Sequence, residues 1–501
     1  MGSISSLSVS SYISPTLHVK ALECRSEAQI EGFIRAFQYP CKVLECQHTQ
    51  RLFAAGIDVK TLTSSRKSSS RIAVVGQRGS DASQEPGNNE SQAKLQENGN
   101  PSSDEASTIE PSRALAGQET PSIESSDWRG QSELEHEGLV ISSGDSDAWD
   151  NGRVGSPIVR RYVSDNEERW CMWYSGENVD ESLGTRVGIA ISSNGMHWRR
   201  GKSKVDTEGQ GEDGAVGLVL DRSENWWAFD TQHLYPSDVL IMSSAKVRAA
   251  SGVYWLYYSG ADAEEMSLPS SAISATPPSH ERFFRGRMRP GLAISNDGRN
   301  WARVEGDHHS GALFDVGAEG EWDSLLIAAP QVVFHEAGDI RMYYHSLDPN
   351  TGKYSVGFAR SRDAMRWLKF GKILEGGGPG SFDEFGIAAR HVVPNPNGSG
   401  YLMVYEGIGA NGRTSVGMAK SAAGLLNWER CQDEPIFRPA DSEQAWDGAG
   451  VGSPCLVHMD GDEWRLYYVG VNARGETAIG MAMNVEGSLT EFKRWHNSTQ
   501  I

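Results

Sequence analysis

WCMWYSG (170–176), YWLYYSG (254–260), IRMYYHS (340–346), YLMVYEG (401–407) and WRLYYVG (464–470) are five variants of one pattern. Each alternates aromatic and aliphatic residues and closes on Gly or Ser, which is typical of a β-strand that ends in a turn. A pattern that recurs at a period of roughly 60 to 90 residues indicates a repeat architecture.

Two further elements flank each copy. Upstream lies an aromatic residue followed by Asp: Trp149-Asp150, Phe229-Asp230, Trp322-Asp323, Phe382-Asp383 and Trp446-Asp447. Downstream, a strand-like segment runs into a turn of Asn-Gly or Asp-Gly type and then an aromatic residue, as in VGIAISSNGMHW (187–198) and PGLAISNDGRNW (290–301). This pattern predicts a hairpin, and the residues after the aromatic would supply an outer strand.

Each copy therefore encodes about four antiparallel strands, which is the content of one propeller blade. The sequence predicts an all-β fold, a five-bladed β-propeller over residues 128–501, with a β-sandwich as the alternative. The last copy is short, and residues 133–141, ELEHEGLVI, are expected to add a strand to it.

The N-terminal region differs in composition. Residues 1–78 are rich in Ser, with no acidic residue before Glu23, which predicts a chloroplast transit peptide. The alternative is N-myristoylation, because Gly2 and Ser6 fit the short motif. Residues 79–127 are polar and acidic, and are interpreted as a disordered linker.

Charge and composition limit the kinds of ligand and partner that the protein is expected to bind. With 47 Lys and Arg against 66 Asp and Glu, the net charge of -19 argues against a nucleic-acid partner. No stretch reaches the length of apolar sequence that a membrane span needs. The six cysteines show neither a disulfide framework nor metal spacing, so no metal and no cofactor are expected.

The order of these elements resembles the five-bladed glycoside hydrolases of the arabinanase, levansucrase and invertase superfamily (families 43 and 32). The resemblance implies an oligosaccharide ligand in a central funnel, cleaved by a carboxylate of the first blade and a Glu acid of the third. At the matching positions this chain has Ser156 and Ala328-Ala329-Pro330. Since these side chains do not exchange protons at neutral pH, the usual catalytic pair is missing.

Residues that break the repeat are the candidates for a replacement site. Asp238 and Glu406 are the predicted carboxylate pair, and His233 is the predicted proton donor. The residues predicted to bind substrate are Arg390, His391, Arg153, Asp150 and Asp230. Because an Asp recurs in every copy, a structural role for Asp150 and Asp230 is the favoured alternative.

The second copy also carries an insertion, residues 261–290, that ends in a basic and aromatic run. It is interpreted as a lid or a protein-docking surface, or alternatively as a solvated loop. Two functions follow from the sequence. One is a carbohydrate-active protein of glycoside hydrolase type with non-standard carboxylates. The other is an inactive propeller that serves as a carbohydrate-binding or protein-assembly module in the chloroplast.

Overall fold

A computed structural model describes residues 136–163, 168–206, 215–243, 252–264, 266, 286–336, 339–396 and 398–496. The predicted transit peptide, the linker and most of the 261–290 insertion lie outside these residues. All the described residues belong to one structural unit, whose regular structure consists of strands and one short 3-10 turn, η3 (Glu181–Leu183). Among them, no helix has the length and apolarity to cross a membrane.

The strands form five groups, each of three consecutive antiparallel strands. The five strands predicted from the repeated pattern are present as the middle strands β3 (Glu168–Glu177), β8 (Gly252–Ala261), β12 (Asp339–Asp348), β16 (Tyr401–Ile408) and β20 (Trp464–Val471). The first strands, called inner strands below, are β2 (Arg153–Val163), β7 (His233–Ser243), β11 (Ala328–Glu336), β15 (Gly386–Pro394) and β19 (Gly450–His458). The third strands are β4 (Thr185–Ser192), β9 (Met288–Ser295), β13 (Lys353–Ser361), β17 (Thr414–Ser421) and β21 (Thr477–Asn484).

Short outer strands complete the groups, as the sequence predicts. They are β5 (Arg199–Arg200), β6 (Gly217–Leu220), β10 (Ala302–Val304), β14 (Leu368–Glu375), β18 (Glu429–Arg430) and β22 (Phe492–Arg494). The turns before these strands are longer than the two-residue turn of a tight hairpin. Ser, Asp and Asn side chains stabilise them by accepting hydrogen bonds from backbone N–H groups of the turn. In the second group, for example, Asp297 accepts bonds from the backbone N–H groups of Arg299 and Asn300.

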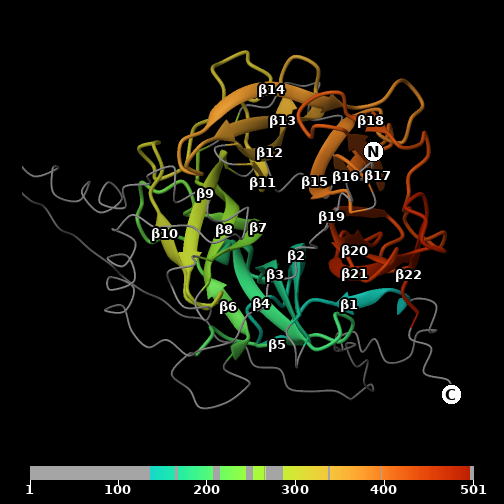
Figure 1. Ribbon diagram of the computed structural model, residues 1–501. Helices are drawn as coiled ribbons and strands as arrows, with labels where there is room; N and C mark the ends of the chain where they lie inside the picture. Colours follow the sequence, from blue (N-terminus) through green and yellow to red (C-terminus); the bar gives the residue numbers. More distant parts are fainter. Residues whose placement is uncertain are drawn as a thin grey trace, which may run out of the picture. The chain divides into compact units, whose positions relative to one another are not determined.

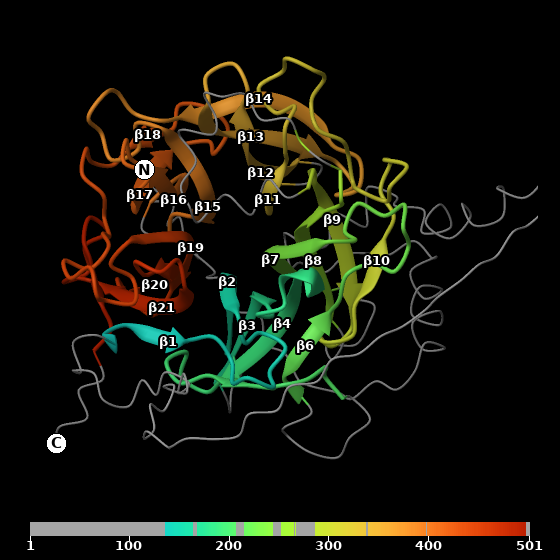
Figure 2. The ribbon, with the colours of Figure 1, turned by 180° about the vertical axis from the view of Figure 1, so that it is seen from behind.

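The inner strands contact one another in a closed cycle, β2 to β7, β11, β15, β19 and back to β2. Figures 1 and 2 show them nearest the centre of the described strands. Strand β1 (Leu139–Ile141) pairs antiparallel with β21, so a segment ahead of the first group is built into the last. This confirms the strand expected from residues 133–141.

An apolar cluster lies between each pair of neighbouring groups, including the last and the first. Trp173 and Phe229 join the first two groups, and Cys455 and Met172 belong to the cluster that joins the last group to the first. Three corresponding clusters join the second to the third, the third to the fourth and the fourth to the fifth groups. Burial of apolar surface therefore stabilises every step of the cycle.

The repeated Asp has the same environment in every group. Its carboxylate accepts a hydrogen bond from the middle-strand Tyr and pairs with a cation on the outer side of the same group. The triads are Asp150/Tyr174/Arg200, Asp230/Tyr258/Arg303, Asp323/Tyr344/Lys369, Asp383/Tyr405/Arg430 and Asp447/Tyr468/Arg494. Each triad ties the entry loop of a group to its middle and outer strands.

Substitution of Asp383 by Asn is expected to lower the free energy of unfolding by about 2 kcal/mol, because Arg430 loses its charged partner. The exposed Asp433, converted to Asn, is the matched control and is expected to change it by less than about 0.5 kcal/mol. Urea titrations of both variants measure the difference. Equal midpoints would show that the triads do not stabilise the groups.

Candidate functional site

Every inner strand carries a bulge near its start, where its register against the middle strand shifts. Each bulge contains one small uncharged residue, Ser156, Ser237, Ala329, Ala389 or Ser453, and a proline follows it in the first, third and fifth groups. Four of the five are partly exposed, although their neighbours along the strand are mostly buried. These five residues are called the axial ring below; the exception in exposure is Ser237, which is buried and donates its hydroxyl to the Tyr235 carbonyl over 3.3 Å.

Three members of the axial ring have left-handed backbone conformations, with φ of 47° at Ser156, 50° at Ala329 and 46° at Ser453. Each precedes a proline, which ordinarily favours an extended conformation. A non-glycine residue in this region costs on the order of 1 kcal/mol, and such outliers concentrate at functional sites. The fold therefore holds these three residues against their local preference.

Side chains of the preceding group hold two of these strained bulges. The hydroxyl of Ser259 accepts a bond of 2.8 Å from the Ala329 N–H, and the Glu406 carboxylate accepts one of 2.9 Å from the Ser453 N–H. Glu406 and Ser259 occupy the same position in their middle strands. A Cβ on Gly452 would lie 2.1 Å from Glu406 Oε2, so a larger residue at 452 would displace the carboxylate from this position.

A second set of side chains links the inner strands directly and is called the axial belt. In four inner strands, one side chain accepts a hydrogen bond from a backbone N–H of the next inner strand. The pairs, acceptor first, are Asp238 and Val332, Gln331 and Val392, His391 and Leu456, and Cys455 and Val159. The corresponding residue of the first group is Ile158, which has no acceptor. There Arg160 crosses from β2 to β7, where it pairs with Asp238 and donates to the Val239 carbonyl over 2.9 Å.

The structure thus places Asp238 in the belt, with 1% of its surface exposed. Burial raises the pKa of this carboxyl, and the Arg160 charge opposes that effect. Glu406 is also buried but bonds to β19, whereas Asp238 bonds to β2 and β11. The two predicted carboxylates are therefore engaged with different strands of the cycle.

His391 is the belt residue of β15. Burial, followed by the charges of Arg160 and Arg390, lowers the pKa of its imidazole to about 3. The ring is neutral at physiological pH, and its Nδ1 accepts the Leu456 N–H over 3.1 Å. Protonation would convert this acceptor into a donor facing another donor.

Arg390 occupies the position of the bulge proline in its group. Its guanidinium donates to the backbone carbonyls of Ala328, Ala329 and Tyr343, and lies 3.2 Å from His345 Nδ1. Burial lowers its pKa to about 9, and Asp238 opposes the shift. The buried Nε has no hydrogen-bond partner, so this cation retains donor capacity beside the axial ring.

The other predicted residues lie further out. His233, at the start of β7, accepts from the Thr185 N–H over 3.3 Å and stacks on Tyr235. Arg153 lies 3.8 Å from Glu177. Asp150 and Asp230 are the fully buried acids of the structural triads.

Sequence reasoning did not single out Gln331, Cys455 and Arg160. A usable signal exists for the first two: Ile158, Asp238, Gln331, His391 and Cys455 each lie eight residues beyond the repeated Asp. A polar or sulfur-bearing residue at a fixed position in four of five inner strands indicates a shared bond. Arg160 has no such signal, since it compensates for Ile158 from two residues away.

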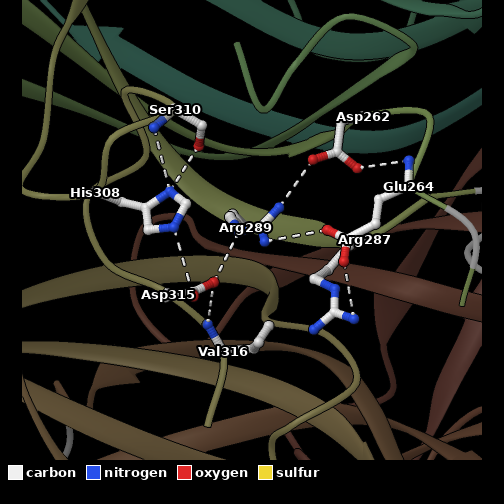
Figure 3. Close-up of polar contacts among 8 residues, drawn as sticks. All are labelled: Asp262, Glu264, Arg287, Arg289, His308, Ser310, Asp315 and Val316. Atoms are coloured by element: carbon white, nitrogen blue, oxygen red, sulfur yellow. Dashed lines mark hydrogen bonds and ion pairs between the residues drawn. The ribbon is translucent and has the colours of Figure 1, made fainter. Parts of the chain in front are cut away.

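The ends of the 261–290 insertion meet in a charged network (Figure 3). Arg289 pairs with Asp262, Glu264 and Asp315, at 2.8, 3.3 and 2.8 Å. His308 lies 3.4 Å from Asp315 and 2.7 Å from the Ser310 hydroxyl. These contacts join both ends of the insertion to the loop that follows β10. Of the basic and aromatic run, Arg287 and Arg289 are described and Arg287 pairs with Glu264 at 3.1 Å, whereas residues 282–285 lie outside the described residues.

Within the described residues, no group of three or more His, Cys, Asp or Glu side chains is placed to hold a metal ion. Cys171, Cys431 and Cys455 are free thiols. The partly exposed side chains of the axial ring are two hydroxyls, of Ser156 and Ser453, and two methyl groups, of Ala329 and Ala389, whereas the Arg390 guanidinium is buried.

No protein-family model matches this chain. A search of curated proteins also found no match. Among solved structures, one described as a glycoside hydrolase is 18% identical, with a TM-score of 0.48, 72% of this chain covered and 94% of the other. A thermostable family-43 glycoside hydrolase is 15% identical, with a TM-score of 0.47 and coverages of 70% and 95%. A glycoside hydrolase from Bacteroides ovatus, described as putative in its title, is 18% identical, with a TM-score of 0.44 and coverages of 71% and 95%.

Replacement of His391 by Asn is expected to flatten the pH dependence of stability. Asn Oδ1 can replace Nδ1 as the acceptor for Leu456, but it does not titrate. In the wild type the unfolded imidazole, with a pKa of about 6.5, binds a proton that the folded one, with a pKa of about 3, does not. The contribution of His391 to stability is therefore fully present above pH 6.5 and falls by about 1.4 kcal/mol per pH unit as the pH drops toward 3.

Urea titrations at several pH values between 4.5 and 7.5, a range that covers most of this window, compare the two proteins. The exposed His309, changed to Asn, is the matched control and is expected to keep the wild-type slope. A variant at position 391 with the wild-type slope would show that His391 titrates freely in the folded protein.

Proposed function

We propose that the chain is a five-bladed β-propeller that binds a neutral, hydroxyl-rich ligand of carbohydrate type at the axial ring and does not hydrolyse it. The five strand groups, their closed cycle of inner strands and the clusters between neighbours support the blade count. Strand β1, paired with the last group, supports closure of the ring.

One observation carries the proposed function: the axial ring consists of Ser and Ala. Hydroxyls exchange hydrogen bonds with sugar hydroxyls, and methyl groups accept the apolar face of a sugar ring. A methyl group takes no part in acid–base or nucleophilic catalysis, and a Ser hydroxyl is an effective nucleophile only where a base activates it. The Glu406 carboxylate, which contacts the ring, already accepts the backbone N–H of Ser453.

Replacement of Ala389 by Phe tests this site. Ala389 is partly exposed on the ring and is not among the positive-φ residues, so its backbone accepts a larger side chain. We expect the variant to bind arabino-, fructo-, galacto- or xylo-oligosaccharides at least about tenfold more weakly, because the phenyl group of the new side chain occupies the space that the ligand needs. Isothermal titration calorimetry on the full-length protein measures the affinity.

The exposed Ala422, on the turn between β17 and β18, is changed to Phe as the matched control and should bind like the wild type. Thermal unfolding of both variants verifies the fold. If the variant at 389 binds with wild-type affinity, the axial ring is not the site.

Hydrolysis by the predicted pair Asp238 and Glu406 is the second candidate function. The raised pKa of Asp238 favours it, because a glycosidase acid must hold its proton near neutral pH. In that case His233 would assist proton transfer, and Arg390, His391 and Arg153 would bind substrate. Asp150 and Asp230 keep the structural role of the triads.

Mass-spectrometric detection of products separates the two functions. Binding without hydrolysis predicts intact oligosaccharides after prolonged incubation with the wild type. Under the hydrolase function, products form and Glu406→Gln abolishes them, whereas Glu463→Gln, an exposed control, does not. Products that survive Glu406→Gln would remove Glu406 from the catalytic pair.

Delivery to the chloroplast by residues 1–78 and protein docking through residues 261–290 are also proposals. A Ser-rich leader without early acidic residues supports the first, and the basic and aromatic end of the insertion supports the second. Imaging of a fluorescent fusion to residues 1–78 tests the address, and co-purification with and without the insertion tests docking.

A further inference from the structure

The entry loops that lead into the inner strands contain one turn that recurs five times. In each, the N–H of the fourth residue bonds to the carbonyl of the first, as in Ala228 to Asn225 and Ala148 to Asp145. The two residues at the tip are exposed in every group. They are Ser146-Asp147, Trp226-Trp227, Glu319-Gly320, Pro379-Gly380 and Glu443-Gln444.

The second group therefore has two tryptophans where the other four have polar residues, Gly or Pro. Trp226 is 88% exposed and Trp227 is 40% exposed. The same turn forms without them elsewhere, so the fold does not require either indole. Two exposed indoles on a turn tip impose an unfavourable contact with water that a ligand would relieve.

Trp227 is partly held in place. A Cβ on Gly311 would lie 3.7 Å from Trp227 Cζ3, so the indole lies against the loop after β10. The same loop carries His308, whose Nδ1 is 2.7 Å from the Ser310 hydroxyl, and the Ser310 carbonyl accepts the Phe229 N–H. The loop after β10 thus connects the charged network around Arg289 to the turn that carries the two tryptophans. Because Trp227 is already held in place, it loses little conformational entropy when a ligand binds.

The surroundings of the turn select the ligand. Asp221, Glu224 and Asn225 are exposed beside the tryptophans, as is His309 on the neighbouring loop. Two aromatic side chains bury roughly 300–500 Å² at most, well below the ~800 Å² per partner of a stable protein interface. Local acidic groups and the net charge of -19 disfavour a polyanion.

We propose that Trp226 and Trp227 form a stacking platform for the sugar rings of a neutral polysaccharide, a second binding site outside the axial ring. A pyranose or furanose ring offers an apolar C–H face to the indole and hydroxyls to the polar rim. The proposal rests on the proposed function in taking carbohydrate as the ligand. An axial ring and a peripheral platform on one molecule would engage two parts of a long chain, which raises avidity.

The test uses affinity electrophoresis of the full-length protein in gels that contain arabinan, levan, galactan or xylan. Trp226→Ala with Trp227→Ala is expected to weaken retardation by about tenfold in polysaccharide concentration, through loss of stacking and apolar contact. Phe370→Ala, which removes another exposed aromatic, is the matched control and should migrate like the wild type.

Two variants separate stacking from general apolarity. Trp226→Leu keeps much of the apolar area without a flat face and should bind as poorly as Trp226→Ala, whereas Trp226→Phe should recover part of the retardation. Equal retardation of the Leu and Phe variants would overturn the stacking proposal. Circular dichroism and thermal unfolding establish that each variant is folded.

The outcomes also separate the platform from the axial site. Loss of retardation in the tryptophan variants, with retardation kept in Ala389→Phe, supports the platform and contradicts the axial proposal. The reverse result overturns the platform and leaves the axial site. A wild type that no polysaccharide retards overturns both.

Discussion

The axial belt is the interaction on which the rest of this structure depends. Four inner strands each offer one buried acceptor to the backbone of the next, and Arg160 closes the fifth step by pairing with Asp238. Buried polar groups must be satisfied, so each acceptor fixes the separation and register of two neighbouring strands. Each residue of the axial ring lies one or two positions before the belt position of its strand. The chemistry available at the centre is therefore set by a framework that already uses Asp238 and His391.

This framework explains why polar residues near the centre are not automatically catalytic. Asp238 pairs with Arg160 of β2 and accepts a hydrogen bond from the Val332 N–H of β11. Glu406 accepts the N–H of the strained residue Ser453, and Arg390 donates to backbone carbonyls. Each would have to give up a structural bond to act on a substrate. In the part of the chain that the structure describes, the small ring side chains of Ser156, Ala329, Ala389 and Ser453 are partly exposed and do not bridge strands in this way. The proposed binding by hydroxyl and methyl groups rests on this difference between the ring and the buried polar residues.

The sequence predicted the middle strands, the hairpins, the outer strands and the β1 addition, because aromatic alternation and turn residues act locally. It also predicted a structural role for the repeated Asp, which the five triads explain. The hydrogen bonds of the belt could not be predicted from the sequence, because bonded residues such as Gln331 and Val392 lie 61 residues apart in the chain. Asp238, Glu406 and Arg390 stood out because they break the repeat. The fold shows that these three residues, which differ from the repeat, form hydrogen bonds to a neighbouring strand.

A crystal structure of the protein with an oligosaccharide that binds it is the most direct test of the account. We predict an intact sugar chain at the axial ring, with hydroxyls bonded to Ser156 or Ser453 and with the Asp238–Arg160 pair and the Glu406 bond to Ser453 unbroken. A cleaved sugar with Glu406 turned toward the broken bond would contradict the account, as would a structure in which the ligand leaves the axial ring empty.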